Sequence, residues 1–235
     1  MTKWKQVWES KKLFSSDKTL TSLIKTDGFD SVYAQYTDQD WLSMCEKINN
    51  IINDKQQNKI LEVGCGAGAL AYGFGLNKEM SFYGVDYSDS LINIAKSVMP
   101  EKAWIVAESC SLPFENDYFD SVVVHSVLQY MPNTEYFRQT ISEILRVCKK
   151  GGKIILADIY DKDKEHEYYR LRSKAINSSV DEYINNNIDF KHMFFTKDFI
   201  YDIFKNNKSI EEIYLNTENN KYINSFYNFS VMVIK

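Results

Sequence analysis

The chain has 235 residues, of which 44% are hydrophobic and 26% are charged, with a formal net charge of −4 at pH 7. These values are typical of one globular domain that is long enough to bury a core. Lys and Arg form no long stripe, which argues against a nucleic-acid partner, because phosphates are bound by clustered positive charge.

No apolar run approaches the roughly 18–20 residues of a membrane-spanning helix. The first residues, MTKWKQVWESKK, are amphipathic and charged, unlike a secretory signal. The four cysteines are far apart and there are only three histidines, so a Cys/His metal site is not expected. We therefore expect a cytoplasmic protein with free thiols, no bound metal and no membrane partner.

Helical stretches precede the first predicted strand. Residues 3–26 predict one or two short helices, in which Trp4 and Trp8 share a face because they lie four positions apart. Residues 29–52 predict another helical stretch with one apolar face. We expect these segments, residues 1–56, to form a lid over the ligand mouth; simple packing on the sheet edge is the alternative.

The most informative stretch is KILEVGCGAGAL, residues 59–70. Its apolar beginning predicts a buried strand, which breaks in a turn with glycine at alternate positions, Gly64, Gly66 and Gly68. Such a turn lets a ligand approach the main chain closely, and the helix that follows presents unpaired N–H groups to an anionic or electron-rich group. A tight turn without a ligand is the alternative.

Apolar strands alternate with helices after the glycine turn. The predicted strands are residues 81–86, 103–107, 119–126 and 153–159. The predicted helices are residues 89–99, with Ser88 as the N-cap, and residues 134–150. This alternation indicates a parallel sheet covered on both faces, which is a doubly wound α/β fold. Ligands of such sheets bind at the carboxyl ends of strands, where this sequence has Gly64, Asp86, Glu108 and His125.

The pattern changes after the fifth predicted strand. Residues 161–195 are polar, helical and rich in tyrosine, which predicts an insertion on the substrate side. Residues 196–235 predict a helix capped by Thr196 and two last strands. We therefore expect a single domain built on a Rossmann-like, seven-stranded, mostly parallel sheet, with its core in residues 57–160.

The stretch E-V-G-C-G-A-G, from Glu62 to Gly68, resembles the first motif of class I S-adenosylmethionine (SAM) dependent methyltransferases. Three further segments resemble the branch that includes ubiquinone and menaquinone biosynthesis methyltransferases: Leu112-Pro113-Phe114, Phe119-Asp120 and LRVCKKGG at residues 145–152. The resemblance implies SAM as the cofactor, S-adenosylhomocysteine as the product and methyl transfer as the reaction.

The resemblance also implies which residues hold the cofactor. Glu62 and the glycine turn would hold the methionine part, Asp86 would accept hydrogen bonds from both ribose hydroxyls, and Glu108 would face the adenine where the family usually has Asp. The expected cofactor-binding residues are Tyr33, Glu62, Gly64, Cys65, Gly66, Gly68, Asp86, Tyr87, Glu108, Ser109 and His125. For Asp86 and Glu108, the alternatives are a helix cap and a surface acid.

Catalysis and substrate binding are expected near the strand ends and in the insertion. A histidine suits removal of a proton from an oxygen acceptor near neutral pH, so His125 and His192 are the catalytic candidates, each with a structural role as the alternative. Arg170 and Arg172 suit a phosphate or carboxylate. The residues expected to bind the substrate are Gln129, Tyr130, Tyr160, Tyr169, Arg170 and His192.

We expect methyl transfer to an oxygen of a small polar metabolite, such as a sugar or phosphorylated precursor of a surface polysaccharide, or a specialised metabolite. The Asn/Asp-Pro-Pro-Tyr type of motif that often accompanies nitrogen acceptors is absent, since residues 125–128 read HSVL. An N-methyltransferase and a non-catalytic SAM-binding protein are the alternatives, whereas the G-x-G-x-G spacing argues against a nicotinamide oxidoreductase. Monomer and homodimer both stay open.

Overall fold

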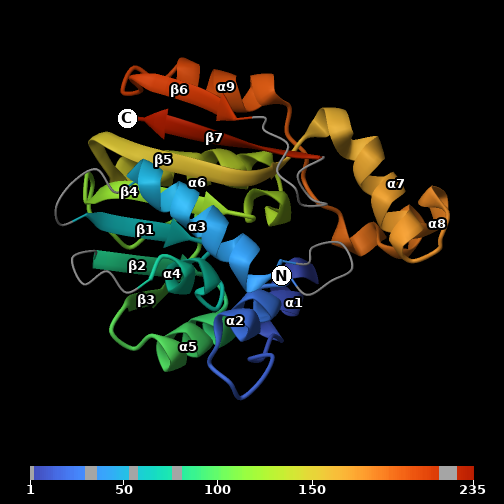
Figure 1. The fold of residues 1–235 in the computed structure, drawn as a ribbon. Coiled ribbons are helices and arrows are strands. Elements are labelled where there is room, and N and C mark those ends of the chain that lie inside the picture. The colour runs from blue at the N-terminus through green and yellow to red at the C-terminus, as the bar shows by residue number, and fades with distance from the viewer. Residues whose placement is uncertain (1–2, 30–35, 53–57, 76–80, 217–226) are drawn as a thin grey trace.

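Figure 1 shows the computed structural model of the chain, in which helices flank a twisted sheet. The structure describes residues 3–29, 36–52, 58–75, 81–216 and 227–235. Tyr33, which the sequence analysis assigns to the cofactor site, lies outside these residues. Two helices, α7 (Glu165–Ala175) and α8 (Val180–Asn186), project at one side of the sheet (Figure 1).

Within the described residues, seven strands form one sheet in the order β3-β2-β1-β4-β5-β7-β6. They are β1 (Lys59–Val63), β2 (Ser81–Asp86), β3 (Ala103–Val106), β4 (Phe119–His125), β5 (Cys148–Tyr160), β6 (Glu212–Asn216) and β7 (Asn228–Ile234). The first five strands run parallel, and β7 pairs antiparallel with β5 and β6. The predicted seven-stranded, mostly parallel sheet is confirmed.

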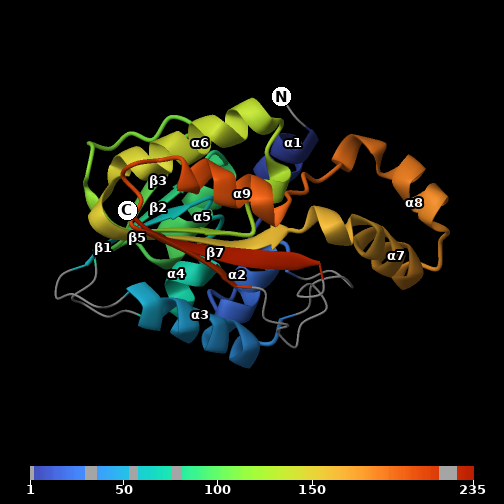
Figure 2. The same cartoon turned by 90° about the horizontal axis from the view of Figure 1, so that it is seen from above.

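Helices cover both faces of this sheet, as Figure 2 shows from above. On one face lie α2 (Leu20–Thr26), α3 (Asp38–Ile52), α4 (Ala69–Gly73) and α5 (Asp89–Val98), and on the other α6 (Thr134–Val147) and α9 (Lys197–Lys205). Side chains alternate along β1, so Ile60 packs in the first core and Leu61 in the second. The double burial explains why the strands are almost wholly apolar.

Side-chain caps determine where two of the predicted helices begin. The hydroxyl of Ser88 accepts the N–H of Leu91 at 3.2 Å at the start of α5. The hydroxyl of Thr196 accepts the N–H of Phe199 at 3.1 Å at the start of α9. Both residues have the extended backbone of an N-cap, and both predicted caps are confirmed.

The junction between α6 and β5 differs from the prediction. The helix predicted over residues 134–150 ends at Val147, and β5 begins at Cys148. Gly151 has φ +68°, and a Cβ on Gly152 would lie 2.7 Å from the sulfur of Cys148. The chain therefore leaves the helix early and folds tightly on itself before it crosses the sheet, which the helical spacing of the apolar residues did not reveal.

Candidate functional site

A cavity of about 630 Å³ opens at the carboxyl ends of β1, β2 and β4. This volume lies in the range of small-molecule sites, roughly 300–1,000 Å³. Its walls also include α1 (Lys3–Glu9), the turn after α2, the segment after β4 and one residue of α7. Figure 1 shows α1 and α7 beside this edge of the sheet. A doubly wound fold binds its ligands at this edge.

The glycine turn after β1 forms one wall of the cavity. The N–H groups of Gly64 and Cys65 donate to the carbonyl oxygen of Val85, at 2.7 and 3.0 Å, which ties the turn to β2. Gly64 has φ +75°, and a Cβ there would lie 2.3 Å from Cγ2 of Val127. A side chain at this position is therefore excluded by the backbone conformation and by the segment after β4.

We expect Gly64→Ala to lower the free energy of unfolding more than Gly75→Ala. Both glycines have positive φ, but a Cβ on Gly75 would meet no atom within 4 Å. The left-handed backbone costs alanine about 1–2 kcal/mol at either position, and the contact with Val127 adds about 1–3 kcal/mol at Gly64. Urea unfolding followed by circular dichroism measures both losses. Equal losses of unfolding free energy in the two variants would show that Val127 can move away from the new Cβ at no cost.

Asp86 ends β2 and holds the glycine turn. Its Oδ2 accepts the N–H of Gly66 at 3.0 Å, and its Oδ1 accepts the N–H of Ser88 at 2.8 Å. Burial raises the pKa of Asp86 to about 6, against the effect of these two hydrogen bonds. Because each carboxylate oxygen accepts more than one hydrogen bond, Asp86 keeps acceptor capacity toward the cavity that it lines.

Two further acids face the same turn. Asp27, which follows α2, accepts the N–H groups of Ala67 at 2.6 Å and Ala69 at 3.1 Å, and burial raises its pKa to about 7. Glu62 is 4% exposed, and its buried Oε2 has no hydrogen-bond partner among the described residues. Burial, with the charges of Asp27 and Asp86, raises the pKa of Glu62. This end of the cavity is therefore acidic and suited to a cation.

Glu108 follows β3 and is held by two side chains. Its Oε1 accepts from Nζ of Lys5 at 2.5 Å, and its Oε2 accepts from the hydroxyl of Tyr136 at 2.7 Å. Burial opposes ionisation, but these two bonds lower the pKa of Glu108 below its ordinary value. Tyr87 lines the cavity nearby, with the ammonium group of Lys5 5.0 Å from its ring centroid. Lys5 thus connects α1 to this side of the cavity.

Helix α1 is tied to the cavity rim at further points. The indole N–H of Trp4 donates to the carbonyl oxygen of Lys191 at 3.1 Å. The hydroxyl of Ser88 donates to the carbonyl oxygen of Trp8 at 3.1 Å. Both tryptophans line the cavity, so the shared helix face expected from their spacing is turned toward it.

Both candidate histidines line the cavity; His125 is buried and His192 is half-buried. The ring of His125 stacks on Phe29 at 5.8 Å, and burial lowers its pKa to about 4. Nδ1 of His192 lies 2.8 Å from the hydroxyl of Tyr168, and burial lowers its pKa to about 3. Each imidazole is therefore neutral at pH 7, and each lies between aromatic side chains.

The structure brings most of the predicted site residues together. The predicted residues that line the cavity are Glu62, Gly64, Cys65, Gly66, Asp86, Tyr87, Glu108, Ser109, His125, Tyr130, Tyr160 and His192. Four others lie outside its lining: Gly68, Gln129, Tyr169 and Arg170. The residues at the strand ends therefore lie together at the cavity, and three of the four residues outside its lining were expected to bind the substrate.

The four departures have structural reasons. Gly68 is the N-cap of α4 and faces the core, where a Cβ would lie 2.8 Å from Cε of Met99. Gln129 is fully buried and donates to the hydroxyl of Ser126 at 3.0 Å. Tyr169 packs against other aromatic rings of the α7–α8 region, and Arg170 is exposed and ion-paired with Glu167 on the same helix.

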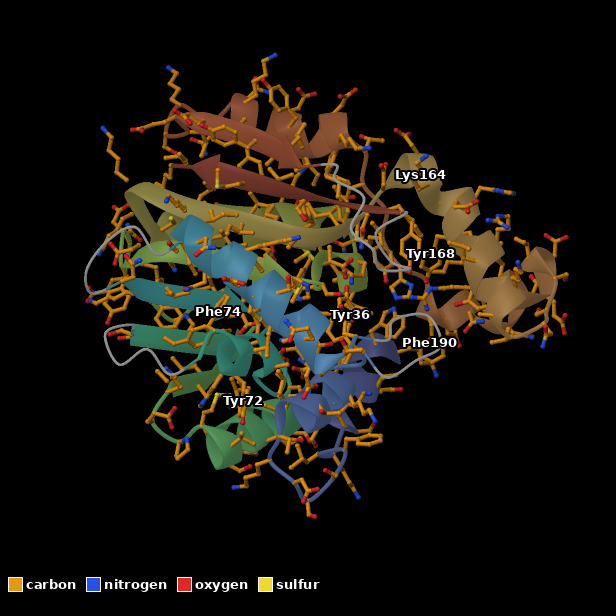
Figure 3. All side chains as sticks on the ribbon, viewed as in Figure 1. Tyr36, Tyr72, Phe74, Lys164, Tyr168 and Phe190 are labelled. Carbon is orange, nitrogen blue, oxygen red and sulfur yellow. The ribbon has the colours of Figure 1, made fainter. Side chains whose placement is uncertain are left out.

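Asp27 and Arg172 are among the residues of the cavity wall that the expected site residues leave out. For Asp27, nothing in the neighbouring sequence indicates that it reaches the glycine turn forty positions away. Arg172 was named only beside Arg170, although Tyr168 and Arg172 lie four positions apart and share a helix face. Figure 3 shows Tyr168 on the side of α7 that faces the sheet, and its side chain is 1% exposed. The spacing of Arg172 from Tyr168 was therefore the signal in the sequence that Arg172 faces the sheet.

Two residues at the strand ends have left-handed backbones. Ser126, after β4, has φ +58°, and Asp158, in β5, has φ +61°. The hydroxyl of Ser126 and the amide of Asn228 both donate to the carboxylate of Asp158. Burial raises the pKa of Asp158 to about 6. Backbone strain of this kind concentrates at functional sites, and here it adjoins the cavity.

None of the helices in the described part of the chain has the length and hydropathy needed to cross a bilayer. The same residues contain no group of three or more His, Cys, Asp or Glu side chains that is placed to hold a metal. All four cysteines are free thiols, and three of them, Cys45, Cys65 and Cys148, are buried.

Comparison with known proteins gives matches centred on the cofactor side of the cavity. A family model described as a methyltransferase domain matches residues 61–156, which run from β1 into β5. The matched segment contains the glycine turn, Asp86, Glu108 and His125.

Curated relatives share part of their length with this chain. A tRNA (carboxymethyluridine(34)-5-O)-methyltransferase of Xenopus tropicalis is 30% identical over 120 residues, which cover 51% of this chain and 18% of that protein. A 2-phytyl-1,4-naphtoquinone methyltransferase of Nostoc punctiforme is 30% identical over 114 residues, which cover 45% of this chain and 48% of that protein. The matches with the first curated relatives cover about half of their length or less, from 2% to 52%.

The likeness to solved structures extends over nearly the whole chain. A Methanococcus maripaludis protein described as a SAM-dependent methyltransferase superposes with a TM-score of 0.61, over 94% of this chain and 95% of its own. At 15% identity, this likeness speaks for the fold alone. The sheet order is that of the class I SAM-dependent methyltransferases, and residues 61–156, which include the glycine turn, belong to the methyltransferase domain family.

Proposed function

We propose that this chain transfers a methyl group from SAM to an oxygen of a small polar metabolite. The observation that carries the proposal is the acidic end of the cavity, where Asp27, Glu62 and Asp86 adjoin the glycine turn. SAM has an ammonium and a sulfonium group besides its carboxylate, so its net charge is positive and complements these acids. The two phosphates of a nicotinamide dinucleotide would be repelled there.

The polar groups of SAM fit the residues present. The buried Oε2 of Glu62 needs a hydrogen-bond donor, and an ammonium group is one. Asp86 offers an acceptor-only carboxylate to two ribose hydroxyls. Gly64 and Gly66 line the cavity, which supports a site for the methionine part beside their main chain. Tyr87 and Glu108 line the cavity on the far side of Asp86, which supports an adenine site between them.

The protein contributes alignment, exclusion of water and an acceptor for a proton. When bound, SAM supplies an electrophilic methyl group on a sulfonium. His125 is 9% exposed and lies against Phe29 and Trp41, which exclude water from that side. His192 is oriented by the hydroxyl of Tyr168 and, being neutral, has one ring nitrogen free of a proton. Both imidazoles line the cavity, which supports either of them as the base for the acceptor's proton.

If one histidine removes the acceptor's proton, its replacement by alanine will lower kcat by about 100-fold. Because burial holds both pKa values near 3 to 4, each imidazole stays neutral as the pH falls, so kcat at saturating SAM should stay constant from pH 8 to pH 5.5. An ordinary histidine base would lose activity near pH 6.5. The exposed His166, changed to alanine, is the control. Full turnover in both His125→Ala and His192→Ala would exclude a histidine base.

The acceptor end supports a polar substrate. Tyr130, Tyr160 and His192 line it, and they offer hydroxyl and imidazole groups. The candidate acceptors are a sugar or phosphorylated precursor of a surface polysaccharide, or a specialised metabolite, and the net charge of −4 disfavours nucleic acid. We infer a cytoplasmic enzyme that needs no metal, with residues 1–56 as a lid and residues 161–195 as a substrate-side insertion.

Calorimetric titration with SAM, S-adenosylhomocysteine and NADH tests the cofactor assignment. We expect micromolar binding of both adenosyl ligands and none of NADH. Acceptor screening then follows release of S-adenosylhomocysteine in the presence of candidate sugars, sugar phosphates and organic acids. If neither adenosyl ligand bound, the proposal would be wrong; if both bound but no acceptor produced turnover, a non-catalytic SAM-binding protein would be the better description.

A further inference from the structure

We propose that Arg172 forms an anion-binding subsite for the methyl acceptor, so that the acceptor carries a carboxylate or phosphate group. This inference rests on the proposed methyl transfer and specifies the chemistry of its substrate. Arg172 lies on α7 and lines the same cavity as the glycine turn, together with Tyr160 and His192.

The charge of Arg172 belongs to a different part of the cavity from the three acids. Asp27, Glu62 and Asp86 act on one another, since each of the first two has its pKa raised by the charge of Asp86. The charge of Arg172 acts instead on tyrosines and on His192, whose pKa it helps to lower. The cavity therefore has an acidic end and a basic end, which suit a cationic cofactor and an anionic acceptor.

Neutral hydroxyl groups surround the guanidinium group. Nη2 of Arg172 donates to the hydroxyl of Tyr160 at 3.4 Å, and the guanidinium carbon lies 4.6 Å from the ring centroid of Tyr168. A hydrogen bond also links Arg172 to Tyr227. Burial raises the pKa of each of these tyrosines, so all three stay uncharged at pH 7. Uncharged phenols solvate the guanidinium but leave its positive charge in place.

The buried acid Asp158, whose pKa the charge of Arg172 lowers, has other hydrogen-bond partners. The carboxylate of Asp158 accepts from the hydroxyl of Ser126 and the amide of Asn228. Burial raises the pKa of Asp158, and the positive charge of Arg172 offsets part of that rise. Asp158 therefore positions the segment after β4, and the guanidinium group faces the cavity.

Several donors converge on the space beside Arg172. The hydroxyl of Tyr160 accepts from Arg172 and keeps its own hydrogen to donate to a ligand. A guanidinium group binds carboxylate and phosphate through two parallel N–H donors, which is why Arg is preferred for such groups. The arrangement thus resembles a receptor for two oxygens of one anion.

Aromatic rings supply the remaining wall. The ring centroid of Trp4 lies 4.8 Å from that of Tyr130 and 4.7 Å from that of His192. All three residues line the cavity, and Figure 3 shows Phe190 and Tyr168 on the elements that adjoin them. An apolar wall next to a cation favours the body of an organic acid or phosphate ester over a free hydrated ion.

Titration of the protein with small anions tests the subsite. The probes are inorganic phosphate, benzoate and the uncharged benzamide, added to protein saturated with S-adenosylhomocysteine and to protein without it. We expect at least one anion to bind, tenfold or more tightly to the unmodified protein than to Arg172→Gln. Arg170→Gln removes an exposed arginine from the same helix and should leave anion binding unchanged. Phosphate and benzoate distinguish the two kinds of anion.

Equal binding of the anions by the unmodified protein and Arg172→Gln, or equal binding of benzoate and benzamide by the unmodified protein, would overturn the proposal. If Arg172→Gln failed to fold, Tyr160→Phe, which lacks one donor hydroxyl, should bind the preferred anion about threefold more weakly, and unchanged binding would count against the subsite. Titration with S-adenosylhomocysteine separates the two proposals. If S-adenosylhomocysteine did not bind, the proposal of methyl transfer would be wrong. Anion binding by the cofactor-free protein would still test the role of Arg172.

Discussion

Replacement of Asp86 by alanine is expected to weaken the binding of SAM and S-adenosylhomocysteine by about 100-fold or more. Hydrogen bonds to a charged acceptor contribute about 1.5–3 kcal/mol each, and two ribose hydroxyls would lose theirs, which corresponds to at least about two factors of ten in affinity. The variant also loses the bond from the N–H of Gly66, so the glycine turn is less firmly held. Isothermal titration calorimetry measures the effect.

The matched control is Asp89→Ala. Asp89 is the exposed first residue of α5, and its removal changes the net charge by the same amount without touching the cavity. The free energy of unfolding of both variants, measured in urea, separates a loss of cofactor contacts from a loss of structure. Unchanged affinity in a folded Asp86→Ala protein would show that Asp86 only caps the turn and that the ribose is held elsewhere.

The affinity for SAM should fall by roughly 100-fold between pH 8 and pH 5.5. A cationic ligand binds the ionised forms of Asp27 and Asp86, whose pKa values are raised by burial to about 7 and about 6. At pH 5.5 their protonation reduces the apparent affinity by roughly 30-fold and fourfold, respectively. Binding near pH 6 should therefore release protons, which calorimetry in buffers of different ionisation enthalpy detects.

The pH dependence of stability has the opposite sign to that of SAM affinity: without its cofactor, the protein should become less stable as the pH rises. A carboxyl group with a raised pKa holds its proton more tightly in the folded state, so ionisation of Asp27 lowers the free energy of unfolding as the pH rises from about 4 to about 7. Asp27→Asn should remove the larger part of both pH dependences, because the asparagine cannot ionise. A constant SAM affinity from pH 8 to pH 5.5 would contradict the role of these acids.

The sequence alone predicted those parts of the fold that are determined by residues close together in the chain. The apolar run ending at Val63, the alternate glycines and Asp86 at the end of the next strand each carry their own signal, and parallel strands bring such ends together. The meeting of Gly64 and Asp86 at one edge of the sheet follows from these rules alone. The N-caps Ser88 and Thr196 were predictable for the same reason, since a cap acts within three residues.

The remaining site residues depend on contacts between distant segments. Asp27 reaches Ala67 only because α2 packs beside α4, and no periodicity in residues 20–30 encodes that contact. Arg172 rather than Arg170 faces the cavity because the phase of α7 is set by the burial of Tyr168. Residues 128–130 form a single helical turn, in which neighbouring side chains point in different directions. Tyr130 of this turn lines the cavity, and Gln129 is turned into the interior.

The two ends of the cavity are encoded in separable parts of the chain. The family match over residues 61–156 includes Glu62 and Asp86, whereas Trp4, Arg172 and His192 come from segments before and after it. Appended helices and loops tolerate insertion and replacement far better than the central strands of a sheet. Divergence of the flanks can therefore give one ancestral cofactor-binding core a new substrate, and a graft that exchanges α1 and the α7–α8 region between homologues is the corresponding route to redesign.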